Sequence, residues 1–163
     1  MCLTEKLKNI SRKFQDHRIL VSLAESCTGG LIAKTLTDIP GSSEWFQFSL
    51  VTYSNSSKIK YLNVKEATLS KFGAVSKEIA EEMSLGAQIS ADNCLSISIT
   101  GIAGPGGGSK QKPIGTIFLC FTYNKKIIKH FQLSLKGERS EIRQQILIFI
   151  INELDKLTLK QQV

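Results

Sequence analysis

Cysteine, histidine and tryptophan are scarce in this 163-residue sequence, which has four, two and one of them. The cysteines (Cys2, Cys27, Cys94 and Cys120) form no Cys-x-x-Cys pair, and two of them lie in apolar runs, as buried free thiols do. This argues against a disulfide framework and favours a reducing, cytoplasmic location. Because the histidines stand at no ligand-like spacing from the cysteines, we expect neither a metal site nor a cofactor.

Long hydrophobic runs are also missing. No stretch of about eighteen apolar residues occurs, so the sequence predicts no transmembrane helix. The first residues carry Glu5 and Lys6 and lack the apolar segment of a signal peptide, so none is expected. The hydrophobic fraction of 42% and charged fraction of 21% are those of an ordinary soluble domain. The length suits one compact domain over residues 1–163.

Positive charge is in excess, with 21 Lys and Arg against 14 Asp and Glu and a net charge of +7. Such a surface attracts nucleic acid or a phosphorylated small molecule. The lysines are dispersed, however, and one Trp and three Tyr leave few rings on which bases could stack. Lysines that solvate the surface are therefore the favoured interpretation, and nucleic-acid binding stays open as a rival.

Hydrophobic patterns predict strands that alternate with helices. Strands are expected at 19–24, 45–53 and 94–100, with a hairpin of 114–123 and 127–135 joined by residues 124–126. Helices are expected at 3–17, 31–39, in short pieces over 55–72, from an N-cap at Ser76 to Ala87, and at 138–157. This order predicts an α/β fold, a mixed sheet with helices on both faces, and leaves the strand order open.

Two glycine-containing loops follow predicted strands, where ligands collect in such sheets. In the first, residues 24–30, backbone N–H groups at the helix start could bind a phosphate or an oxyanion, or the loop could be an ordinary N-cap using Ser26 or Thr28. The second, residues 101–108, has five glycines but matches neither a Walker A loop nor the Gly-x-Gly-x-x-Gly pattern. A backbone cradle for a small ligand is favoured there over a plain flexible loop.

The scarcity of histidine narrows the range of possible catalytic mechanisms. A Ser-His-Asp triad would need His17 or His130, but neither is near a glycine loop, and both are expected at the surface. A serine can instead be activated by a lysine held neutral. Lys58 lies about one helical turn beyond Tyr53 and could share a site with it, or be a solvated surface lysine. Cys27 competes with Ser26 as nucleophile, and we expect only one of these neighbours to face a ligand.

The last predicted helix begins with two arginines, Arg139 and Arg143, on one face. Positive charge at a helix N-terminus opposes the helix dipole, so an anion should lie nearby. The anion could be Glu138 or Glu141, or the phosphate of a ligand.

Six ordered segments resemble the CinA C-terminal domain family, whose stand-alone members are similar to nicotinamide-nucleotide amidases. These are Ala24-Glu25-Ser26-Cys27-Thr28-Gly29-Gly30, residues 51–55, 73–76, Ile99-Thr100-Gly101-Ile102-Ala103-Gly104-Pro105-Gly106-Gly107, 112–116 and 137–139. The resemblance covers about residues 5–155, with Thr100 at a position where the family commonly has Ser. It does not include the separate N-terminal domain of longer members.

The resemblance implies a three-layer α/β/α fold and a metal-free Ser/Lys hydrolase of nicotinamide mononucleotide. Ser26 would be the nucleophile and Lys58 the general base, with Tyr53 assisting. Ligand contacts would come from Thr28, Gly29, Gly30, Gly101, Ala103, Gly104 and Arg139, with Arg143 a weaker candidate for the phosphate. A homo-oligomer is expected from family habit. The alternative is a nucleotide-binding or regulatory module without catalysis.

Overall fold

The computed structural model describes residues 2–88 and 92–157, whose strands form one five-stranded sheet. The order is β2-β1-β3-β4-β5, with bounds β1 Leu20–Glu25, β2 Phe46–Val51, β3 Cys94–Gly101, β4 Thr116–Tyr123 and β5 Lys126–Ser134. β1 pairs in parallel with β2 and β3, whereas the β3–β4 and β4–β5 pairs are antiparallel. In the described sheet, β4 alone therefore opposes the common strand direction, and the predicted mixed sheet with one hairpin is confirmed.

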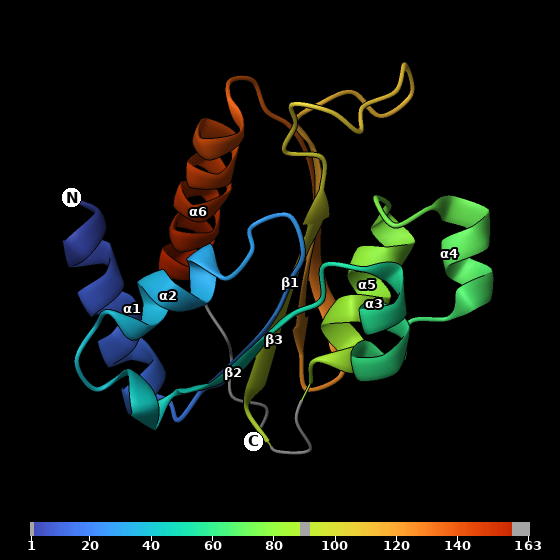
Figure 1. Cartoon of the computed structure of the whole chain (residues 1–163). Coiled ribbons are helices and arrows are strands. Elements are labelled where there is room, and N and C mark those ends of the chain that lie inside the picture. The colour runs from blue at the N-terminus through green and yellow to red at the C-terminus, as the bar shows by residue number, and fades with distance from the viewer. Residues whose placement is uncertain (1, 89–91, 158–163) are drawn as a thin grey trace.

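Helices cover both faces of the sheet (Figure 1). On one face lie α1 (Leu3–Asp16), α2 (Leu31–Thr37) and α6 (Arg139–Lys156). On the other lie α3 (Asn55–Leu62), α4 (Glu66–Phe72) and α5 (Lys77–Gly86). This confirms the predicted α/β/α layers. None of the helices in the described ranges is long and apolar enough to cross a membrane.

The main core lies between the sheet and the α1, α2 and α6 layer. Helix α1 buries Leu7, Ile10 and Phe14, whose spacing places them on one side of the helix. The single tryptophan, Trp45, is 1% exposed and packs edge-on against Phe14. Its Nε1 donates a 3.0 Å hydrogen bond to Ser11 Oγ, so the indole N–H keeps a partner inside the core.

Strand β3 is buried on both sides, although every second residue is polar. Leu95, Ile97 and Ile99 join the main core. On the opposite face, Ser98 and Thr100 donate hydrogen bonds to the carbonyls of Ala80 and Ala74. These small side chains let α5 approach the sheet closely, and backbone carbonyls of α5 (Ala80) and of the loop before it (Ala74) satisfy their hydroxyl groups. The end of β3 is thereby attached to the loop that enters α5.

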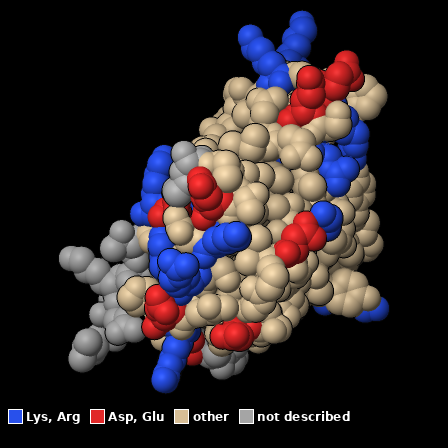
Figure 2. Space-filling view, turned by 90° about the vertical axis from the view of Figure 1, so that its left-hand side faces the viewer, with Lys and Arg blue, Asp and Glu red and all other residues tan. Residues whose placement is uncertain are grey.

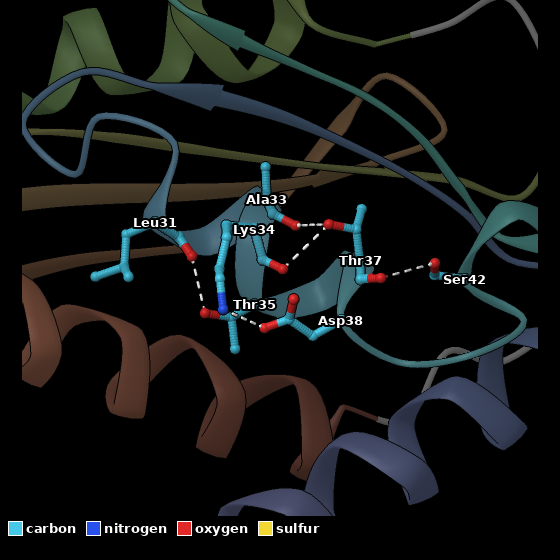
Figure 3. Close-up of polar contacts among 7 residues, drawn as sticks. All are labelled: Leu31, Ala33, Lys34, Thr35, Thr37, Asp38 and Ser42. Carbon is cyan, nitrogen blue, oxygen red and sulfur yellow. Dashed lines mark hydrogen bonds and ion pairs between the residues drawn. The ribbon is translucent and has the colours of Figure 1, made fainter.

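The expected bounds of the helices and strands lie within two residues of those observed, and two of the differences have a physical cause in the structure. The hairpin turn has two residues, not three: Asn124 and Lys125 both have positive φ, 47° and 62°, as in a type I′ turn. Helix α2 ends at Thr37 instead of Ile39. Figure 3 shows why it can stop there: the Thr37 hydroxyl donates back to the Ala33 and Lys34 carbonyls, and Ser42 Oγ donates to the Thr37 carbonyl.

Candidate active site

The candidate site is a cavity of about 250 Å³ at the carboxyl ends of β1 and β3. After β1 the chain forms α2 on one face of the sheet and returns as β2, beside β1. It then forms α5 on the opposite face and returns as β3, on the other side of β1 (Figure 1). Ligands of open α/β sheets bind at such a divergence. The Ser26 N–H donates to the Ile99 carbonyl at 3.0 Å, which fixes the end of β1 to the end of β3.

Ser26 and Lys58 meet at the floor of this cavity. Lys58 Nζ lies 3.0 Å from Ser26 Oγ and donates to the Thr52 carbonyl at 2.6 Å. The Ser54 side chain caps α3 by accepting from the Ser57 N–H at 3.1 Å, which sets the start of the helix and so directs Lys58 inward. Lys58 is 1% exposed, so the alternative of a solvated surface lysine is wrong.

Burial changes the acid–base behaviour of Lys58. It lowers the pKa of the amino group from 10.5 to about 8, because desolvation penalises the ammonium form. Near pH 7, roughly one molecule in ten then carries a neutral amine, several hundredfold more than for a solvated lysine. A neutral amine 3.0 Å from a hydroxyl can accept its proton, which is the arrangement a serine nucleophile requires.

Glu25, the residue before Ser26, is fully buried and organises the loop between β1 and α2. Its carboxylate accepts five hydrogen bonds, from Thr28 Oγ1 (2.7 Å), Ser49 Oγ (3.3 Å) and the N–H groups of Gly30 (2.9 Å), Ile32 (3.3 Å) and Ala33 (2.9 Å). A negative charge at the first turn of α2 is stabilised by the helix dipole and by these donors. The carboxylate therefore fixes the loop that carries Ser26.

This arrangement corrects one expectation. The N–H groups at the start of α2 were predicted to be free for a phosphate or oxyanion, but Glu25 occupies those of Gly30, Ile32 and Ala33. The Gly29 N–H donates to the Ser26 carbonyl at 3.1 Å. Among the described residues, the N–H groups of Cys27 and Thr28 donate to no other residue, so they are the donors still available in this loop.

Arg139 and Tyr53 form the rim of the cavity. Arg139 donates to the Gly104 carbonyl through Nη1 at 2.8 Å and to the Tyr53 hydroxyl through Nη2 at 2.7 Å. All three residues line the cavity. Tyr53 is 60% exposed and contacts Arg139, with no hydrogen bond to Ser26 or Lys58 within the described chain.

Arg143 lies outside the cavity lining and donates to the Thr28 carbonyl. Across the described residues, neither Arg139 nor Arg143 forms an ion pair, so pairing with Glu138 or Glu141 does not account for them. Arg139 therefore has a position suited to a ligand, whereas Arg143 supports the loop that carries Ser26.

Cys27 also contributes to the cavity lining, and it belongs to the main core as well. Burial raises the pKa of the Cys27 thiol to about 11, which leaves it protonated near neutral pH. Both histidines are exposed and outside the lining, as predicted. In the part of the chain that the structure describes, no group of His, Cys, Asp and Glu could hold a metal ion.

Comparison with known proteins gives this site a family context. The family model described as the CinA C-terminal domain matches residues 4–158. The chain belongs to the CinA C-terminal domain family. It is 46% identical, over 129 residues, to a protein of Enterobacter agglomerans named nicotinamide-nucleotide amidohydrolase PncC, and the match covers 79% of each chain.

Longer relatives match over only part of their length. A CinA-like protein of Endomicrobium trichonymphae is 49% identical over 134 residues, which cover 82% of this chain and 31% of that protein. The chain thus spans about a third of the length of such relatives. Among solved structures, the competence/damage inducible protein CihA of Agrobacterium tumefaciens superposes with a TM-score of 0.87 at 39% identity, covering 93% of each chain.

Several residues that build the candidate site were not predicted from the sequence. Glu25 lies within the 24–30 motif but had no predicted role, although an acidic residue just before a Gly-Gly helix start is the available signal for an N-terminal carboxylate cap. Ala74 and Val75 enter the lining from the loop before α5, and Gly106 from the second glycine loop. Of the predicted ligand residues, Gly101, Ala103 and Gly104 line the cavity, whereas Thr28, Gly29 and Gly30 lie behind it, around Glu25.

Proposed function

We propose that the protein hydrolyses the carboxamide of nicotinamide mononucleotide to nicotinate mononucleotide and ammonia, with Ser26 as nucleophile and Lys58 as base. The observation that carries this proposal is the 3.0 Å approach of a buried lysine amine to a cavity-lining serine hydroxyl. The similarity to a protein named nicotinamide-nucleotide amidohydrolase supports the choice of substrate. A cytoplasmic role in pyridine-nucleotide salvage is part of the same proposal.

In the first half-reaction, neutral Lys58 takes the Ser26 proton while Oγ bonds to the carboxamide carbon and the carbonyl electrons move onto oxygen. The Cys27 N–H, which belongs to a cavity-lining residue and donates to no other described residue, is our candidate for binding this oxyanion. One well-placed donor contributes about 3–4 kcal/mol to such a step. The C–N bond then breaks as the Lys58 ammonium protonates the leaving nitrogen, which gives ammonia and an acyl ester of Ser26.

In the second half-reaction, water is the nucleophile and Ser26 Oγ is the leaving group. Lys58, neutral again, takes a proton from water as the water oxygen bonds to the acyl carbon. The bond to Ser26 Oγ breaks, the oxygen regains a proton from Lys58, and nicotinate mononucleotide leaves. The Thr52 carbonyl keeps Nζ in place throughout, because it accepts from the amine in either protonation state.

Arg139 is the proposed partner of the nucleotide phosphate. It lies on the cavity rim, and its two present acceptors are neutral oxygens, so a phosphate dianion would compete with them. Tyr53 would then be a mobile neighbour of the ligand and not a proton carrier, since it contacts Arg139 and not Ser26.

The test of this function is a substrate panel. Nicotinamide mononucleotide should release ammonia and nicotinate mononucleotide in equal amounts, and nicotinamide riboside should react less efficiently because it lacks the phosphate. The kcat/KM should rise with pH to a plateau above about pH 8, where Lys58 is neutral. Tight binding of nicotinamide mononucleotide without turnover would instead identify a binding or regulatory module.

A nucleic-acid role finds less support on the surface. On the side of the molecule that Figure 2 presents, Lys and Arg side chains are interspersed with Asp and Glu instead of forming one continuous basic patch. A DNA titration at several salt concentrations tests that rival. DNA affinity that depends only weakly on salt, or DNA binding that is lost near physiological salt, would argue against it.

A further inference from the structure

Two loops supply neighbouring walls of the cavity. The 72–76 loop, which runs from the last residue of α4 to the residue before α5, contributes Ala74 and Val75. The segment between β3 and β4 contributes Ile102, Gly104 and Gly106, among others. The width of the cavity therefore depends on how these loops are held relative to each other.

The 72–76 loop is fixed by side chains and not by a strand ladder. Its first three carbonyls each accept a hydrogen bond from a different side chain: Phe72 from Lys112 Nζ (2.7 Å), Gly73 from Ser76 Oγ (2.9 Å) and Ala74 from Thr100 Oγ1 (2.8 Å). Ser76 belongs to the same loop, and Thr100 lies at the end of β3 beneath it. Lys112 is the donor that comes from the segment between β3 and β4, residues 102–115, which we call the glycine-rich segment.

Lys112 is itself held in a closed turn. The Ser109 N–H donates to the Lys112 carbonyl at 2.9 Å, and the Lys112 N–H donates to Ser109 Oγ at 3.0 Å. Three residues later, the Gly115 N–H donates to the Ile102 carbonyl at 2.7 Å, which fixes the base of the segment. The half-buried ammonium is thus a charged donor on an ordered support, and its bond to Phe72 joins the two walls.

We infer that Lys112 is a positioning residue that sets the width of the ligand cavity by tying the glycine-rich segment to the 72–76 loop. The identity of the ligand rests on the proposed function, but the tie between the loops does not. Ser26 and Lys58 stand on other elements and make no hydrogen bond to Lys112. Loss of the amino group should therefore weaken ligand binding and leave the chemical step intact.

The experiment compares Lys112→Met with Lys110→Met, an exposed lysine of the same turn whose side chain makes no hydrogen bond among the described residues. With nicotinamide mononucleotide, Lys112→Met should raise KM by roughly tenfold, the scale of one charge-assisted hydrogen bond, with kcat within about twofold and an unchanged pH profile. Lys110→Met should match the parent, and Lys112→Arg, which keeps a cationic donor, should recover part of the affinity.

Hydrogen exchange of the backbone amides in residues 73–76 gives a second readout that needs no substrate. Faster exchange in Lys112→Met than in Lys110→Met supports the tie even if nicotinamide mononucleotide proves not to be the substrate. Equal exchange in the two variants, or a fall in kcat with KM unchanged, would overturn the inference. Absence of turnover in the parent, by contrast, would count only against the proposed function.

Discussion

Replacing Glu25 by Gln should destabilise the protein strongly, although the two side chains have nearly the same shape. The carboxylate oxygen Oε2 accepts from Thr28 Oγ1 and two backbone N–H groups, and Oε1 accepts from Ser49 Oγ and the Ala33 N–H. A glutamine replaces one of these oxygens with an NH₂ group, which is a donor. In either orientation, that group faces at least one backbone N–H.

The magnitude follows from the less costly orientation. With NH₂ in place of Oε1, the Ser49 hydroxyl can rotate to accept, but the part-buried Ala33 N–H is left without a partner, which costs about 1–3 kcal/mol. The bonds that remain lose their ionic component, and α2 loses a negative charge at its first turn, about 0.3–1 kcal/mol. We expect the free energy of unfolding to fall by about 2–4 kcal/mol.

Trp45 provides the assay, because the sequence has one tryptophan and it is 1% exposed in the fold. Urea unfolding followed by its fluorescence should give a lower midpoint for Glu25→Gln with an unchanged slope. Glu66→Gln is the matched control, since Glu66 is exposed and in the first turn of α4. A free energy of unfolding for Glu25→Gln within about 0.5 kcal/mol of that of the parent would refute the role assigned to the carboxylate.

Three further predictions concern the lysine, the cysteine and the glycines. Because burial lowers the pKa of Lys58 from 10.5 to about 8, the folded protein binds fewer protons than the unfolded chain between these values. The stability of the parent relative to Lys58→Met should therefore rise between pH 8 and 10.5 by up to about 3 kcal/mol, and a flat difference in pH-dependent urea unfolding would contradict the lowered pKa. Cys27→Ala should retain most of the turnover measured by ammonia release, because the thiol is protonated near pH 7; an inactive, folded variant would reopen the question of the nucleophile. Gly101→Ala should lower the thermal midpoint, because its Cβ would lie 2.4 Å from Ile117 Cδ1 and 2.8 Å from the Thr116 carbonyl oxygen, whereas Gly106→Ala, with open space at that point, should not; equal midpoints would refute this packing argument.

Local patterns predicted most of the fold. The apolar spacing of Leu7, Ile10 and Phe14 is enough to predict α1, and the alternation along β3 is enough to predict a strand. The strand order could not be predicted, because it depends on which faces the connecting helices cover. Pattern alone also did not reveal that Ser98 and Thr100 are buried, since their partners are backbone carbonyls more than fifteen residues away in the sequence.

The sequence predicted which residues form the candidate site better than it predicted the contacts between them. Ser26 and Lys58 are 32 residues apart, and the local sequence alone favoured a surface position for Lys58. Only the family resemblance indicated that Lys58 belongs to the site. The free helix N-terminus was expected because the glycines were visible, whereas the carboxylate that occupies it points inward from the strand before them. The contact of Arg139 with Tyr53 joins residues 86 positions apart and has no local signal.

The most direct test of the central claim is ammonia release from nicotinamide mononucleotide by the purified parent and by Ser26→Ala, with nucleotide binding measured on both. The proposed mechanism predicts release by the parent, none by the variant, and binding by both, since Ser26 supplies the attacking oxygen and Arg139 the proposed phosphate contact. Undiminished release by a folded Ser26→Ala variant would contradict it, because the hydrolysis would then proceed without the serine that Lys58 contacts.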